Sequence, residues 1–368
     1  MKEKFYVGAA TAAHQTEGDN IHSDCRVQEN LKHSSYAEPS GRAVDHYHRY
    51  KEDIDLLKEA GLNAYRFSIE WARIEPEQGQ FSKEEMKHYE DVIDYCLVND
   101  IEPVVTLHHF SSPAWLIREG GWKSEKTVTY FARYTEYVIK HIRNKVHYIC
   151  TINEANMGFQ LKKIAGDMMK SRKRKKEGDV QVGVNVDMKN VLFSLFEESK
   201  AFRCPLFKVN TFLNPRSLEE EKIVMACHVK AKEVIKKNYP GIQVGLTLSL
   251  FDYQPQQGGE EKAKQLWQED FGYYLPYIEE DDFLGVQNYS RKIVTKEGAQ
   301  APSAQAKLTQ MGYEYYPSSI GHVVEKVSKE FHQKILVTEN GVATDNDEDR
   351  CSFIKEALAS VLKARENG

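Results

Sequence analysis

The sequence lacks the cysteine patterns of a disulfide framework or of a metal site. None of its six cysteines forms a CxxC pair, and their spacing is irregular: Cys25, Cys96, Cys150, Cys204, Cys227 and Cys351. We therefore expect free thiols in a cytoplasmic protein. The pairs His46/His48 and His108/His109 are interpreted as structural rather than metal-binding, so neither a metal nor a cofactor is expected.

Long apolar segments and excess positive charge are also lacking. No run approaches the roughly 18 apolar residues that cross a membrane. The apolar patch near the start is interrupted by His14 and Gln15, which leaves it too short for the apolar core of a secretory signal. Formal net charge is −5 over 368 residues, which gives no general basic field for nucleic acid. We therefore expect a protein that binds neither membranes nor nucleic acid.

One basic run departs from this overall charge. The segment 170–176 has six basic residues in seven positions. It is interpreted as a solvated loop, and a docking patch for an anionic partner is the alternative. The run falls within 160–218, a long variable region expected between the fourth and fifth strands.

What the sequence does contain is an alternation of short apolar runs and longer amphipathic stretches. Each of the expected strands is followed by an expected helix, and the strands are 5–10, 63–68, 102–108, 147–153, 243–250, 282–289 and 334–339. Such alternation predicts a parallel sheet covered by helices. The fold class is therefore α/β, a (β/α)8 TIM barrel that is incomplete, with seven βα units and strand eight absent. We expect one domain over 1–368.

Polar side chains gather at the expected carboxyl ends of these strands. In a TIM barrel those ends meet at one mouth, where functional residues lie. The side chains found there are Gln15, Arg66, His109, Asn153, Glu154, Tyr289 and Glu339. This mixture of donors and acceptors suits a hydroxyl-rich ligand. Trp71, Trp115 and Trp122 are interpreted as core or wall rather than as sugar platforms.

Two of these groups are carboxylates, Glu154 after strand four and Glu339 at the end of strand seven. One protonated carboxyl can donate to a leaving oxygen while the other, kept ionised near an Arg and a Tyr, attacks carbon. That is the mechanism of a retaining glycosidase. The alternative is that either glutamate only caps the helix that follows.

Five longer motifs carry a resemblance to a known family. They are "FYVGAATAAHQTEG" (5–18), "DHYHRYKEDIDLLKEAGLNAYRFSIEWARIEPEQG" (45–79), "TLHHFSSPAWL" (106–116), "TINEAN" (151–156) and "VTENG" (337–341). With them the chain resembles glycoside hydrolase family 1, the β-glucosidase and 6-phospho-β-glycosidase family. The resemblance implies that Glu154 is the acid/base and Glu339 the nucleophile. It also implies sugar contacts from Gln15, His109 and Asn153, and charge stabilisation of the nucleophile by Arg66 and Tyr289.

The sequence departs from the family pattern in several places. Ala155 replaces the proline of the acid/base motif, and Phe110 replaces a tryptophan. No block resembling the family's eighth strand follows the last helix. We therefore expect weak and broad hydrolysis of small β-glycosides, with a slot between the first and seventh strands. A second copy of the chain could cover that slot. The alternative is a catalytically silent sugar-binding or interaction protein derived from a truncated family 1 glycosidase.

Overall fold

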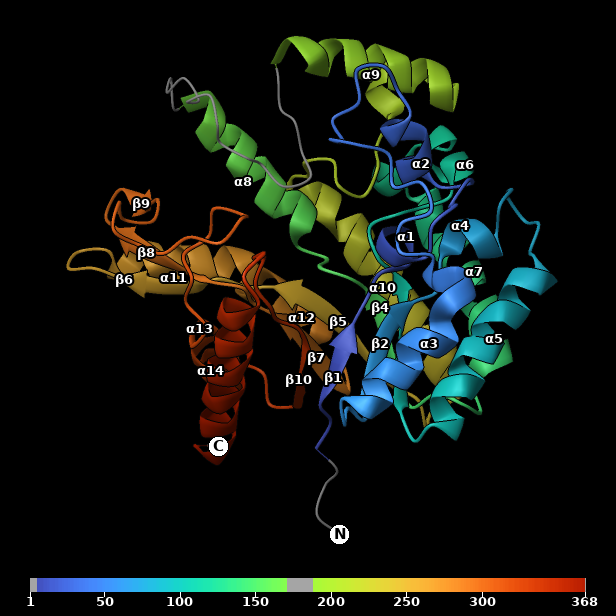
Figure 1. The fold of residues 1–368 in the computed structure, drawn as a ribbon. Coiled ribbons are helices and arrows are strands. Elements are labelled where there is room, and N and C mark those ends of the chain that lie inside the picture. The colour runs from blue at the N-terminus through green and yellow to red at the C-terminus, as the bar shows by residue number, and fades with distance from the viewer. Residues whose placement is uncertain (1–4, 171–187, 368) are drawn as a thin grey trace. The chain divides into compact units, whose positions relative to one another are not determined.

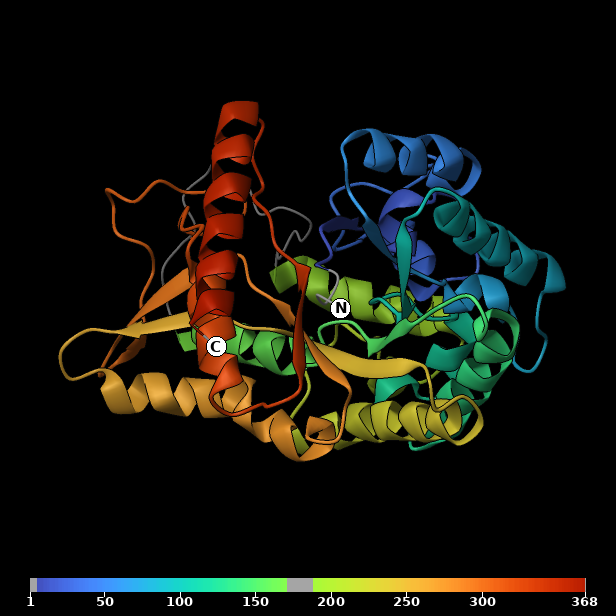
Figure 2. The ribbon, with the colours of Figure 1, turned by 90° about the horizontal axis from the view of Figure 1, so that it is seen from below.

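The computed structural model describes residues 5–170 and 188–367, and Figures 1 and 2 show their helices and strands. The chain forms two compact units. The first comprises 1–163 and 183–246, and the second comprises 164–182 and 247–368. Each unit is described by itself below, and the expectation of one domain over 1–368 stays a prediction.

The first unit is built on parallel strands. They are β1 (Gly8–Ala10), β2 (Ala64–Ser68), β3 (Glu102–His108), β4 (Tyr148–Ile152) and the beginning of β5 (Gln243–Ser249). Each pairs with the next in parallel. All residues of β2 are buried, so the strand has no solvent-facing side and shows no polar alternation.

Four long helices follow strands of the first unit, namely α3 (His46–Glu59), α5 (Lys83–Val98), α7 (Lys126–Ile142) and α10 (Leu218–Asn238). Side-chain hydrogen bonds cap the amino ends of two of these helices. Ser82 accepts the N–H of Glu85 at the start of α5, as its position before two acidic residues predicts. Ser217 and Glu220 form a reciprocal capping box at the start of α10.

The first unit also contains shorter helices: α1 (Ala13–Thr16), α2 (Asp24–Glu29), α4 (Trp71–Ile74), α6 (Ala114–Arg118), η1 (Gly121–Lys123) and η2 (Leu206–Lys208). Trp71, Trp115 and Trp122 are buried, which confirms their interpretation as core residues. Trp71 stacks on Tyr134 from α7, so the short helix α4 is held against the long one.

The structure places two helices at least partly within the expected long loop at 160–218. These are α8 (Met157–Lys170) and α9 (Met188–Phe202). The loop expectation was therefore wrong for those residues, because their apolar side chains repeat at helical rather than irregular spacing. The basic run 170–176 lies outside the residues whose side chains the structure describes.

The second unit contains two further strands of the main sheet, β7 (Phe283–Gln287) and β10 (Lys334–Glu339), paired in parallel. Its helices are α11 (Glu260–Asp270), η3 (Gly272–Tyr274), α12 (Leu275–Ile278), α13 (Ser319–Ser328) and α14 (Asp347–Glu366). A small second sheet, which the sequence did not predict, consists of β6 (Asp252–Pro255), β8 (Arg291–Thr295) and β9 (Gly298–Ala299).

The main sheet has the strand order β1-β2-β3-β4-β5-β7-β10. Its fold class is therefore the one expected, an incomplete (β/α)8 barrel with seven βα units. No eighth strand joins this sheet within the described residues. The slot between the first and seventh strands stays a prediction.

Candidate active site

Three of the expected sugar-binding and charge-stabilising residues meet in the first unit. Arg66, in the buried strand β2, donates from Nη2 to Oδ1 of Asn153 at 2.6 Å. The amide Nδ2 of Asn153 lies 3.1 Å from Nε2 of His109. His109 and Asn153 directly follow β3 and β4, and Arg66 lies within β2, two residues before its end. The parallel strands therefore bring all three side chains together toward the carboxyl ends of the sheet.

The protonation of His109 follows from its surroundings. Burial lowers the pKa of His109 well below its ordinary value, and the nearby charge of Arg66 lowers it further. The ring is therefore neutral near pH 7. Since Oδ1 of Asn153 already accepts from Arg66, the amide turns its N–H toward Nε2 of His109, which accepts.

Glu154 comes directly after Asn153, in the turn between β4 and α8. Its side chain is buried, with 5% of the residue exposed. Its φ of 42° lies in the left-handed region, which is uncommon for a residue with a side chain. Strain of this kind is kept where the surrounding structure demands it, often at functional sites. The carbonyl of Glu154 also accepts the N–H of Met157, which starts α8.

Gln15 is placed differently from the other expected sugar contacts. It lies in α1, shortly after β1, and its side chain is exposed. No hydrogen bond from this side chain to another described residue is formed. The structure therefore brings Arg66, His109 and Asn153 into one hydrogen-bonded set, and Gln15 is not part of it.

The second unit holds Glu339 between two donors. Glu339 is the last residue of β10, and the hydroxyl of Tyr289 donates to its Oε2 at 2.5 Å. Gln287 donates from Nε2 to its Oε1 at 2.8 Å. Both donors come from the end of β7, which pairs with β10, and Glu339 is opposite Gln287 in the register. Donors on both oxygens fix the orientation of the carboxyl group.

Gln287 was missed in the sequence, although one signal could have found it. Side chains two residues apart in a strand point to the same face. Once Tyr289 is assigned to the nucleophile, Gln287 is the next side chain on that face. The turn after Glu339 is fixed as well, because Asn340 donates from Nδ2 to the carbonyl of Asn288 at 2.7 Å.

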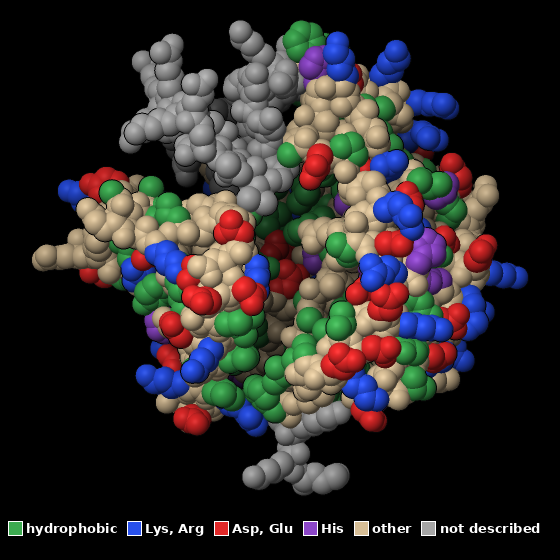
Figure 3. Space-filling view, viewed as in Figure 1, with side chains coloured by type: hydrophobic (Ala, Val, Ile, Leu, Met, Phe, Trp, Pro, Cys, Tyr) green, Lys and Arg blue, Asp and Glu red, His purple; other side chains and the backbone are tan. Residues whose placement is uncertain are grey.

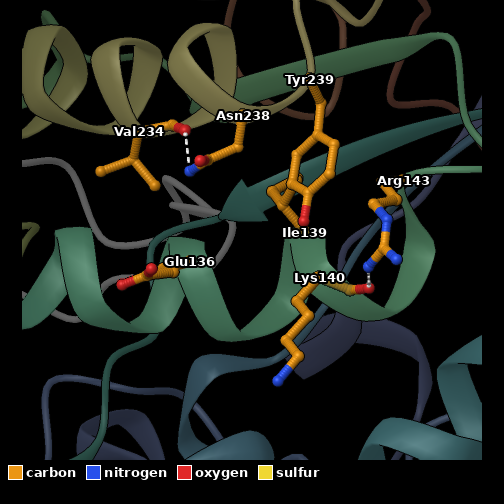
Figure 4. A pocket seen from close by; sticks show the side chains of 7 residues that line it. All are labelled: Glu136, Ile139, Lys140, Arg143, Val234, Asn238 and Tyr239. Atoms are coloured by element: carbon orange, nitrogen blue, oxygen red, sulfur yellow. Dashed lines mark hydrogen bonds between the residues drawn. The ribbon is translucent and has the colours of Figure 1, made fainter.

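A pocket elsewhere in the first unit is not part of this site. It has a volume of about 230 Å³ and is lined by residues near the carboxyl ends of α7 and α10, among them Lys140, Arg143 and Tyr239 (Figure 4). The carboxyl end of α7 precedes the start of β4, so the pocket lies at the opposite end of the strand from Glu154. Features at that end of a barrel serve stability rather than chemistry.

Among the residues that the structure describes, no group of three or more His, Cys, Asp or Glu side chains could hold a metal ion. His46 contacts Asp53 and Tyr65, in keeping with a structural role. No described helix has the length and apolar character needed to cross a membrane. On the face shown in Figure 3, Lys and Arg side chains are interspersed with Asp and Glu.

Comparison with known proteins assigns the family. Residues 1–187 match the family model described as glycosyl hydrolase family 1. The chain belongs to glycosyl hydrolase family 1. It is therefore a glycoside hydrolase, a β-glycosidase in the coarse sense of that family. The catalytically silent alternative is not favoured by these relationships.

Named relatives cover the whole chain. A 6-phospho-beta-galactosidase of Clostridium acetobutylicum is 26% identical over 100% of this chain and 86% of its own length. Beta-glucosidase A of Thermotoga maritima is also 26% identical with the same coverage. Among solved structures, beta-glycosidase BGL167 superposes with a TM-score of 0.88 at 36% identity, over 99% of this chain and 84% of its own.

Proposed function

We propose that this family 1 enzyme is a retaining β-glycosidase that hydrolyses small β-glucoside-like substrates by double displacement. The carboxylate of Glu339 would attack the anomeric carbon while Glu154 gives its proton to the leaving oxygen. Water would then attack the glycosyl-enzyme, with Glu154 taking the proton and Glu339 leaving as the carboxylate.

The observation that carries this proposal is the pair of donors on Glu339. A nucleophilic carboxylate must stay ionised and point one oxygen at the carbon it attacks. Tyr289 and Gln287 donate to different oxygens of Glu339, and the paired strands β7 and β10 fix all three residues. A carboxylate that only capped a helix would need neither donor.

The remaining residues take supporting roles in the proposal. His109 and Asn153, with Gln15, would contact sugar hydroxyls. Arg66 is already hydrogen-bonded to Asn153 and would add positive charge near the nucleophile. Neutral His109 can both donate and accept hydrogen bonds, which suits hydroxyl groups. Exposed Gln15 would contribute little to the choice of sugar, so the proposal includes weak and broad activity.

The proposal is tested by release of nitrophenol from aryl β-glycosides. Glucoside, galactoside, fucoside and 6-phosphorylated substrates should be compared, because named relatives include both a beta-glucosidase and a 6-phospho-beta-galactosidase. Glu339→Gln should reduce turnover to background, because no other group forms the glycosyl-enzyme. The exposed residue Glu297 supplies a matched control, and Glu297→Gln should leave turnover unchanged.

Glu154→Gln should act selectively. General acid catalysis contributes roughly 10²–10⁴-fold, and the loss should fall mainly on poor alkyl leaving groups that need a proton. Activated dinitrophenyl leaving groups should lose much less in the first step. Equal losses for both leaving groups would contradict the acid role, and wild-type turnover in Glu339→Gln would contradict the nucleophile.

A further inference from the structure

Asn288 stands between Gln287 and Tyr289, the two residues that donate to Glu339. It directly follows the last residue of β7, and only 1% of it is exposed. A buried amide has to place its N–H groups and its carbonyl on partners, because an unpaired polar group away from water is costly. The partners of this amide therefore show which parts of the second unit it joins.

The amide nitrogen of Asn288 uses both of its hydrogens on backbone carbonyls. Nδ2 donates to the carbonyl of Leu250, just after β5, and to that of Ser290, each at 2.8 Å. Because these carbonyls can only accept, they fix which end of the amide faces them. The other end, Oδ1, accepts the hydroxyl of Ser319 at 2.7 Å. The side chain thus joins the chain after β5 and after β7 to the start of α13.

One of these bonds closes a ring around Tyr289. The side chain of Asn288 reaches the carbonyl of Ser290, two residues further on, so it bridges the backbone of the tyrosine between them. Such a local bridge restricts the φ and ψ of the enclosed residue, and with them the direction of its Cβ. The hydroxyl of Tyr289 lies at the far end of a rigid ring. A small change in the direction of Cβ would therefore move that hydroxyl further than the Cβ itself.

The backbone of Asn288 is bonded to the turn that carries the nucleophile. Its N–H donates to the carbonyl of Glu339 at 3.4 Å, and its carbonyl accepts from Nδ2 of Asn340 at 2.7 Å. Its side chain meanwhile bridges the backbone of Tyr289. Both partners of the 2.5 Å bond from Tyr289 to Glu339 are therefore attached to one buried residue.

We propose that Asn288 is a positioning residue, which holds the hydroxyl of Tyr289 against Glu339 and so sets the direction in which the nucleophile points. This inference rests on the proposed function, because it concerns the attack by Glu339. Asn288 takes no part in making or breaking bonds, and it acts on the reaction through Tyr289. A residue that only stabilised the fold would change the melting temperature without acting through Tyr289.

A double-mutant cycle tests this role. The substrate is a dinitrophenyl glycoside of the sugar that the enzyme cleaves best, because an activated leaving group needs little proton donation. Asn288→Ala should lower kcat/KM about 10- to 100-fold, the order of loss that a misplacement of up to about 1 Å brings. In Tyr289→Phe, which has no hydroxyl to position, the same substitution should cost at least about threefold less, since residues of one network are not additive.

Asn63 supplies a matched control in the first unit. Its amide also joins backbone groups, since it accepts the N–H of Val7 at 2.8 Å and donates to the carbonyl of Phe5 at 3.1 Å. It precedes β2, at the amino end of that strand. Asn63→Ala should therefore lower the melting temperature and leave kcat/KM unchanged.

Ser319→Ala is a milder second variant. It removes only the hydroxyl that Oδ1 of Asn288 accepts. If Asn288→Ala does not fold, Ser319→Ala takes its place in the cycle and in the crystal structures below. Its loss of kcat/KM should be smaller and should also decrease in Tyr289→Phe.

Equal losses from Asn288→Ala in wild type and in Tyr289→Phe would overturn the positioning role while leaving the glycosidase function intact. If wild type cleaves no glycoside, the proposed function fails, and crystal structures of wild type and Asn288→Ala decide on the inference. In the variant the hydroxyl of Tyr289 should lie beyond the roughly 3.5 Å of a hydrogen bond from Oε2 of Glu339. A distance that stays at 2.5 Å would overturn the inference.

Discussion

Asp24, at the start of α2, is a buried acid whose two oxygens have unequal surroundings. Its Oδ1 accepts the N–H groups of Cys25 and Ser112, each at 2.8 Å. Its Oδ2 has no hydrogen-bond partner among the described residues. Burial raises the pKa of Asp24 to about 7. Ionisation of Asp24 is therefore less favourable in the folded protein than in the unfolded chain.

This raised pKa predicts a pH effect on stability. The stabilising contribution of protonated Asp24 is fully present below its unfolded pKa of about 4 and is lost as pH rises through about 7. Asp24→Asn keeps an acceptor at Oδ1 and carries no charge. The variant should gain stability relative to wild type between pH 4 and pH 8, by about 1.4 kcal/mol per unit of pKa difference.

Urea unfolding of both proteins at pH 4 and pH 8 measures this relative gain. The comparison isolates Asp24, because the pKa of Glu17, also raised to about 7 by burial, is common to both proteins. A stability difference between Asp24→Asn and wild type that stays the same at the two pH values would contradict the prediction.

Residue types and positions after strands were enough to predict most of the candidate site. Arg66, His109 and Asn153 were expected at one mouth, and the structure places them within hydrogen-bonding distance. The pair of Tyr289 and Glu339 was expected as well. Backbone conformation could not be predicted, and the left-handed Glu154 is the clearest case, because no glycine marks that turn.

At the scale of elements, strand β7 owes its position to a glycine. A Cβ added at Gly285 would lie 2.5 Å from Cγ2 of Thr247 in β5 and 2.9 Å from Cγ2 of Thr338 in β10. Gly285→Ala must therefore push β7 away from its neighbours. Overpacking of this kind costs about 1–3 kcal/mol of stability.

The same displacement should reach the nucleophile, because its donors lie close by in the chain: Gln287 ends β7, two residues after Gly285, and Tyr289 follows two residues later. We expect Gly285→Ala to lower kcat/KM for aryl glycosides together with the melting temperature. Gly241 provides the control, since a Cβ there meets no atom within 4 Å. If Gly285→Ala and Gly241→Ala had the same melting temperature and the same kcat/KM, the close approach of the three strands would be refuted.

The seven main strands could be predicted because buried parallel strands are short apolar runs that alternate with amphipathic helices. The small sheet of β6, β8 and β9 was not predicted. The sequence of β6 resembles that of a loop, because its pairing partner β8 is distant along the chain: Asp252 lies opposite Arg291. Continuation of β5 and β7 past the sheet edge depends on that tertiary pairing rather than on local pattern.

At the scale of the whole molecule, helix α14 carries an apolar stripe on its exposed side. Ile354, Leu358 and Leu362 are spaced four residues apart and are 45%, 42% and 44% exposed. The first turn of α14 is acidic and its last turn is basic. A second copy of α14 running antiparallel would cover the stripe and place each acidic end beside a basic end.

We therefore expect the protein to form a dimer whose fraction rises with concentration. Leu358→Lys should shift the equilibrium toward monomer, because the dimer would bury a charged side chain at the centre of the stripe. Sedimentation velocity over a range of protein concentrations measures it. Leu97→Lys, at an exposed leucine of α5, should leave the dimer intact. A wild-type protein that remains monomeric at every concentration would show that α14 is not a self-association surface.

The assignment of Glu339 as the nucleophile is the claim on which the proposed function depends, and covalent labelling tests it most directly. A 2-deoxy-2-fluoro-β-glycoside with an activated leaving group slows the second displacement more than release of the aglycone, so the glycosyl-enzyme accumulates. Mass spectrometry of the digested protein should then find one sugar on the peptide containing 334–343, attached to Glu339. Label on another carboxylate such as Glu154, or turnover of the parent glycoside with no covalent label, would contradict the double-displacement mechanism proposed for this enzyme.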